Sequence, residues 1–269
     1  MNRKRNTLAA GAEEAAGLLE RPLASRSLVL SLLLGRHPPE APVALLVRWC
    51  GLFGVSATSA RVALSRMVER GELTTTDGTY ALAGRLVERQ ADQDQALAPA
   101  VRPWNGEWLM AVVDDGRREP ADRVALREAL RRSRLVPWRE AVWVRPDNIG
   151  DPPATAADRA VIGRQCTWWR ARPAQPIDVT AAYDLPRLLE RGTRLNELIA
   201  SATDALPDPD ALAAGFVIGA ATAQHLRRDP LLPPELLPPG WPAEDLRRRY
   251  ATYTEAMDGA IAAWLRRVG

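Results

Sequence analysis

Apolar residues recur at the spacing of an amphipathic helix between positions 57 and 68. The side that such a helix would bury consists of Ala57, Ala60, Leu64, Met67 and Val68. Gly71 ends this pattern, and residues 73–75 and 79–82 read as two strands around Asp77-Gly78, a strong hairpin signal. The pattern therefore predicts a helix that is followed at once by a small hairpin.

The opposite side of this helix carries hydrogen-bond donors and no acidic residue. Its members are Thr58, Ser59, Arg61, Ser65 and Arg66. Upstream, hydrophobic runs predict helices over 21–36 and 43–53, and Gly54 supplies a short turn before the third helix. Three helices and a hairpin in this order are typical of a winged helix-turn-helix. We interpret residues 21–90 as a DNA-binding domain that contacts DNA through the five donor residues. The alternative is an ordinary amphipathic helix whose polar side is simply hydrated.

The pattern of apolar and polar residues changes at Trp104, after a predicted linker over 91–103. Short apolar runs predict buried strands over 108–113 and 141–144, with an amphipathic helix over 121–134 between them. A further helix and strand follow, over 154–163 and 167–170. This order predicts a ferredoxin-like α/β sandwich for residues 104–176.

Helical patterns dominate the remainder, and we expect a helical C-terminal domain over 177–269. Its predicted helices cover 184–204, 208–227 and 243–267. A proline-dense segment over 229–242 lies before the last helix, and its regular leucines indicate a buried strap. Residues 1–20 are expected to be a mobile tail. The expected fold class is α+β.

The distribution of charged residues and the spacing of the two cysteines limit the classes of function that the chain can have. Residues 1–90 carry 12 Lys and Arg against 8 Asp and Glu, whereas residues 151–269 carry 14 against 15. The basic surplus therefore lies where phosphate contacts would be needed. Cys50 and Cys166 have no metal or redox spacing and are expected to be buried thiols. No signal peptide or membrane-spanning run is found, so we expect a cytoplasmic protein without a membrane partner.

Four landmarks resemble the PaaX-type repressors of phenylacetic acid catabolism. They are Ala63-Leu-Ser-Arg-Met-Val68 before Gly71, Trp104-Asn-Gly-Glu-Trp108 with Val142-Trp-Val-Arg-Pro146, Ala182-Tyr-Asp-Leu185, and Arg228-Asp-Pro-Leu-Leu-Pro-Pro-Glu-Leu-Leu-Pro238 with Gly240-Trp-Pro242. The sequence departs from the family pattern at Tyr183, where a Trp is usual, and at Ala243, where a Gly is common. The resemblance covers about residues 21–267.

The resemblance implies a homodimeric transcriptional repressor of a catabolic or related operon. It further implies release from double-stranded operator DNA by a small effector, namely phenylacetyl-CoA or another aryl-acyl-CoA. Such a ligand needs cations for its phosphates and an apolar slot for its acyl group. The candidate residues are Trp168, Trp169, Arg170, Arg172, Arg227 and Arg228. No cofactor is expected.

Two other functions stay open at this point. One is a DNA-binding protein that responds to no effector. The other is a metal-dependent nuclease, because Asp114 and Asp115 follow the first predicted strand of the ferredoxin-like domain. No second acidic or histidine cluster accompanies these acids, and His37 and His225 are expected at exposed helix ends. We therefore expect no enzyme, no catalytic residue and no bound metal.

Overall fold

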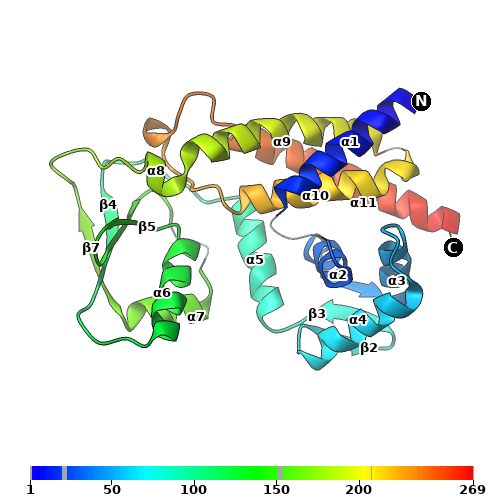
Figure 1. Ribbon diagram of the computed structural model, residues 1–269, viewed down its shortest axis with the longest axis horizontal. Coiled ribbons are helices and arrows are strands. Elements are labelled where there is room, and N and C mark those ends of the chain that lie inside the picture. Colours follow the sequence, from blue (N-terminus) through cyan, green and yellow to red (C-terminus); the bar gives the residue numbers. More distant parts are fainter. Residues whose placement is uncertain (1, 20–22, 151–153, 207, 269) are drawn as a thin grey trace. The chain divides into compact units, whose positions relative to one another are not determined.

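The computed structural model describes residues 2–19, 23–150, 154–206 and 208–268. It contains helices and two antiparallel sheets, which confirms the expected α+β class (Figure 1). By its internal contacts the chain divides into two compact units. The first unit comprises residues 1–93, 192–227 and 242–269, and the second comprises residues 94–191 and 228–241. The expected C-terminal domain is thus shared between the two units.

The first unit contains the N-terminal helices, a small sheet and the C-terminal helices. Its elements are α1 (Asn2–Leu18), α2 (Ser25–Leu34), β1 (Glu40–Pro42), α3 (Val43–Gly51), α4 (Ala57–Glu69), β2 (Leu73–Thr76), β3 (Thr79–Leu82), the first part of α5 (Arg85–Leu97), most of α9 (Leu185–Ala205), a 3-10 turn (Pro209–Ala211), α10 (Leu212–Leu226) and α11 (Ala243–Val268). The strand order of its sheet is β1-β3-β2, and both pairs are antiparallel.

An aromatic cluster joins the N-terminal helices to the C-terminal helices of this unit. The buried Trp49 ring of α3 meets Phe216 of α10 and Trp264 of α11 edge to face, with ring centroids 4.7 and 6.4 Å apart. Large aromatic rings dominate the burial energy of a core. This packing explains why residues so far apart in sequence form one unit.

The N-terminal segment is a helix, and the expectation of a mobile tail over 1–20 is wrong for the residues that the structure describes. Helix α1 packs along α10 (Figure 1), and its Leu8 and Ala15 side chains are buried. On its outer side, Glu14 accepts two hydrogen bonds from Arg194 of α9, at 2.5 and 2.6 Å. Tertiary packing therefore orders a segment whose own sequence pattern is weak.

The second unit is a four-stranded antiparallel sheet with helices packed against it (Figure 1). Its elements are β4 (Trp108–Val113), α6 (Pro120–Arg132), β5 (Val136–Arg139), β6 (Val142–Pro146), α7 (Ala156–Gly163), β7 (Cys166–Ala171), α8 (Thr180–Tyr183) and a 3-10 turn (Pro234–Leu236). The strand order is β5-β6-β4-β7. Strand β5 was not expected from the sequence.

The faces of this sheet have separate cores. One holds Ala111, Trp143 and Cys166 beneath the apolar sides of α6 and α7. The other collects Trp108, Val144 and the buried leucine of the proline-dense segment, Leu232. Asn148 fixes that segment further, because its side-chain amide donates to the Leu231 carbonyl at 2.8 Å. The segment is thus the packed strap that its leucines predicted.

Candidate nucleic-acid interface

Helix α4 begins at a side-chain cap that the sequence analysis did not single out. The Ser56 hydroxyl accepts a hydrogen bond from the Ser59 backbone N–H at 3.2 Å. This bond satisfies one of the four N–H groups that a helix leaves unpaired at its start. Gly54 lies just before it with φ +76°, a conformation that glycine adopts without steric cost. The Ser-x-x-Ser spacing before the apolar run was the available signal.

The five residues predicted to contact DNA are all exposed on α4, and Ala60, Leu64 and Met67 form its buried side. The Ser59 hydroxyl accepts a hydrogen bond from Ser56 at 2.9 Å, so it belongs partly to the cap. Val62 lies among these polar residues with 44% of its surface exposed. Val62 was not among the DNA contacts predicted from the sequence. An exposed methyl-bearing side chain on such a helix can contact the methyl group of thymine.

The hairpin after α4 has the conformation that its turn residues predicted. Asp77 and Gly78 both have positive φ, 49° and 75°, as a two-residue hairpin turn requires. Residues 74–76 are exposed threonines, and the hairpin carries no basic side chain between Gly71 and Tyr80. Strand β1 pairs with β3 on its other side. The hairpin therefore offers hydroxyl groups rather than positive charge.

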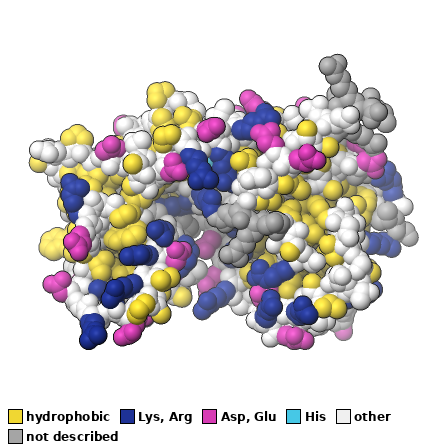
Figure 2. All heavy atoms as spheres, in the orientation of Figure 1, with side chains coloured by type: hydrophobic (Ala, Val, Ile, Leu, Met, Phe, Trp, Pro, Cys, Tyr) yellow, Lys and Arg dark blue, Asp and Glu magenta, His cyan; other side chains and the backbone are white. Residues whose placement is uncertain are grey.

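An ion pair holds Glu72, the residue directly before β2. Arg26 at the start of α2 donates two hydrogen bonds to the Glu72 carboxylate, at 2.8 and 2.9 Å. Hydrogen bonding from Arg26 holds the pKa of Glu72 below its usual value. Basic side chains lie on the surface around α4 in the view of Figure 2. Acidic side chains lie there as well, and the exposed Glu69 and Asp77 belong to this region, so the ion pair removes one of its negative charges.

The six residues predicted to bind an effector divide between the two units. Trp168, Trp169, Arg170 and Arg172 lie on or just after β7, and Arg228 lies in the same unit, whereas Arg227 belongs to the other unit. Arg170 is already bound to Asp147 at 2.8 Å, and Arg172 donates to the Asn105 carbonyl at 2.6 Å. Both Trp side chains are exposed, by 40 and 59%. The role of these six residues stays a prediction.

One of the two acids of the alternative nuclease function, Asp114, has a structural partner. Asp114 accepts a hydrogen bond from the Thr167 hydroxyl at 2.8 Å. Within the described ranges, no group of three or more His, Cys, Asp or Glu side chains is arranged to hold a metal ion.

Both cysteines are buried, as expected, and burial raises the pKa of Cys166 to about 11. His225, expected at an exposed helix end, is buried instead, because Gly192 lets α9 approach it closely.

Two family descriptions match this chain. "PaaX-like protein" matches residues 24–86, and "PaaX protein central Cas2-like domain" matches residues 101–182. The chain belongs to the PaaX family. Among solved structures it is similar to an uncharacterized protein, Rv0674, from Mycobacterium tuberculosis. The two are 38% identical with a TM-score of 0.69, over 90% of this chain and 98% of the other. A comparison with curated protein sequences found no match.

The PaaX family consists of DNA-binding transcriptional regulators, and its members are regulators rather than enzymes. The first match coincides with α2 to β3 and therefore contains all five predicted DNA contacts. The second match contains the four-stranded sheet. No helix within the described residues is long and apolar enough to cross a membrane.

Proposed function

We propose that this chain is a winged helix-turn-helix repressor that reads operator DNA with α4. The observation that carries the proposal is the exposed side of α4, which holds Arg61 and Arg66 with small hydroxyl residues and lies directly before a hairpin. The order α2, β1, α3, α4, β2, β3 is that of the winged module, with α4 in the place of the recognition helix. In such helices the N-terminal residues usually contact base edges. Arg61 is therefore assigned to bases, and Arg66, further along, to phosphate.

The second unit supports the expected ferredoxin-like arrangement. Its elements follow the order β4-α6-β5-β6-α7-β7, the βαββαβ pattern of that fold. Its sheet ends at β7, which pairs with β4 on one side only. Open strand edges and exposed aromatic patches are surfaces that proteins usually cover. We assign this edge, with Trp168 and Trp169, to contact with a second copy of the chain, which would form the two-fold dimer that a symmetric operator needs.

Effector control is the third part of the proposal. The PaaX resemblance implies release by an aryl-acyl-CoA and a catabolic or related operon. An effector can release DNA only if it prefers a dimer arrangement whose recognition helices no longer match the half-sites. A coupling of about 2–3 kcal/mol would lower operator affinity about 30- to 150-fold, and DNA would weaken effector binding by the same factor. The proposed place of action is the cytoplasm.

The direct test is recovery of DNA fragments from the host genome by the purified chain. We expect enrichment of a site with two-fold symmetry, and affinity that falls steeply with salt because phosphate contacts release counterions. Recovery of unrelated fragments without a common site would contradict the proposal. The recovered site then serves for titrations with phenylacetyl-CoA, other aryl-CoA esters and free CoA. Unchanged operator affinity in all of them would leave a DNA-binding protein that responds to no thioester.

A further inference from the structure

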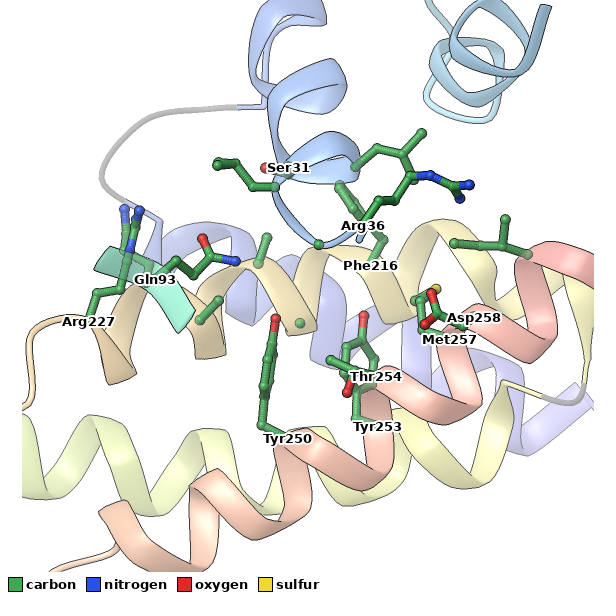
Figure 3. Close-up of a pocket in the computed structure, with 18 of the residues that line it drawn as sticks. Ser31, Arg36, Gln93, Phe216, Arg227, Tyr250, Tyr253, Thr254, Met257 and Asp258 are labelled. Atoms are coloured by element: carbon green, nitrogen blue, oxygen red, sulfur yellow. The ribbon is translucent and has the colours of Figure 1, made fainter. Parts of the chain in front are cut away.

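A cavity of about 110 Å³ lies within the first unit, between the winged module and the C-terminal helices. Its walls come from the end of α2, from α5, and from α10 and α11 (Figure 3). An engineered apolar cavity of about 150 Å³ is known to accept benzene. The present cavity is smaller but partly open to solvent, so it is on the scale of a ligand that carries a single ring.

Three polar side chains line this cavity with their hydrogen-bonding groups unused. They are the guanidinium of Arg227, the amide of Gln93 and the hydroxyl of Tyr250. Within the described part of the chain, none of the three side chains makes a hydrogen bond or an ion pair with another protein group. Figure 3 shows Arg227 and Gln93 at one end of the cavity, with the Tyr250 hydroxyl pointing up toward the same side. Unused donors that converge on a concave surface are typical of a ligand site.

The charge at this end is positive. Burial lowers the pKa of Arg227 to about 10, and the nearby charge of Arg89 acts in the same direction, while Tyr250 and Asp92 act against it. Arg227 still carries its charge at neutral pH. Burial raises the pKa of Tyr250 to about 12, so its hydroxyl remains a neutral donor. A bound anion would relieve the repulsion between Arg227 and Arg89.

The other end of the cavity is mostly apolar. Phe216 and Met257 form part of this wall, together with Leu32 and Ile261. One acid, Asp258, also lines this end, and burial raises its pKa against the opposing charges of Arg36 and His37. Asp258 lies apart from Arg227 in Figure 3. The cavity thus combines a cationic end with an apolar body, which is the pattern for a carboxylate attached to a hydrophobic group.

We propose that this cavity binds a small organic acid, with its carboxylate at Arg227, Gln93 and Tyr250 and its aromatic or short aliphatic body against Phe216 and Met257. A CoA thioester has no carboxylate at its acyl end and is far larger than the cavity. The inference rests on the proposed regulatory function for its meaning, and it adds a small organic acid as a second ligand beside the proposed thioester effector.

The cavity walls connect the ligand to the DNA-reading helix. The Gln90 amide on α5 donates to the Leu34 and Arg36 carbonyls at the end of α2, at 3.3 and 2.8 Å. Helix α2 in turn packs against α3 and α4. A ligand that moves α5 or α2 against α10 and α11 therefore changes the position of α4 within the same unit.

The test is calorimetric titration of the full chain with benzoate, phenylacetate and hexanoate, with benzamide and benzoyl-CoA as comparisons. We expect at least one acid to bind. Benzamide, which lacks the negative charge, should bind with an affinity that is lower by about 10-fold or more. Arg227→Gln should weaken the acid about 10- to 100-fold, because it removes a charge-assisted hydrogen bond. Tyr250→Phe should weaken it about 3- to 10-fold, because it removes one neutral hydrogen bond. Arg266→Gln removes the same charge from the exposed end of α11 and should change nothing.

Binding of none of the acids would overturn the inference, as would binding of benzoyl-CoA alone. Equal affinity of Tyr250→Phe and the unaltered chain for the acid would also overturn it, even if Arg227→Gln failed to fold. Operator binding is measured on the same samples. Operator binding without acid binding refutes this inference alone, whereas acid binding without operator binding refutes the proposed function alone.

Discussion

Gly219 on α10 is the position where the close approach of two helices can be tested by a single methyl group. A Cβ atom there would lie 2.2 Å from the Tyr253 hydroxyl oxygen and 2.4 and 2.5 Å from two ring carbons. Tyr253 is buried on α11, and its hydroxyl donates to the Gly215 carbonyl at 3.0 Å. Gly219→Ala must therefore displace a packed aromatic ring.

Three contributions determine how far Gly219→Ala lowers the free energy of unfolding. Overpacking a core costs about 1–3 kcal/mol, and loss of the Tyr253 hydrogen bond about 1 kcal/mol more. The better helix propensity of alanine offsets about 1 kcal/mol. The free energy of unfolding should therefore fall by about 1–3 kcal/mol in Gly219→Ala. Gly259→Ala on α11 is the matched control, since nothing lies within 4 Å of its Cβ position. That variant should gain about 0.5–1 kcal/mol.

Urea unfolding of the full chain, followed by circular dichroism, measures both variants. Adding Tyr253→Phe to Gly219→Ala should restore part of the loss, because the nearest atom is removed while the ring carbons remain. If Gly219→Ala were as stable as Gly259→Ala, the packing of α11 on α10 described above would be wrong.

Three further predictions concern the cap, an ion pair and the dimer. Ser56→Ala should lower the free energy of unfolding by about 0.5–2 kcal/mol because α4 loses its cap, and Ser56→Asp should not; equal stability of both would contradict the cap. Glu72→Gln should destabilise the chain modestly at pH 7. Because Arg26 lowers the pKa of Glu72, this difference should shrink as the pH falls below the ordinary glutamate pKa of about 4.3 and vanish below the lowered pKa of Glu72. A pH-independent difference in urea midpoints would exclude the ion pair as its cause. Arg in place of both Trp168 and Trp169 should shift sedimentation toward the monomer, whereas an unchanged dimer would place the contact elsewhere.

Helical periodicity and short apolar runs located the elements whose pattern is local. The helices over α2, α3 and α4, the hairpin and the strands β4, β6 and β7 were all predicted, as were the three long C-terminal helices. Strands β1 and β5 were not. Both are short edge strands that contain a proline, Pro42 and Pro137, and proline reads as a break in a sequence.

Features that depend on distant parts of the chain were also missed. Helix α1 is ordered by α10, and nothing in its own pattern predicts this partner. The burial of His225 depends on Gly192 in another helix. The cavity between α5, α10 and α11 joins residues more than a hundred positions apart, of which Arg227 alone was among the predicted effector residues. The predicted contacts on α4, by contrast, all lie in one local pattern.

The central claim is that α4 reads DNA, and the pair Arg61→Ala and Arg66→Ala on the recovered operator tests it most directly. Affinities for the operator, for single-base variants of it and for unrelated DNA are measured at several salt concentrations. Arg61→Ala should lose about 1–3 kcal/mol on the operator and tolerate substitution at one base pair. Arg66→Ala should weaken all sequences about equally and reduce the salt slope by about 1. Operator affinity and specificity that both variants retain in full would contradict the assignment of α4 as the DNA-reading helix.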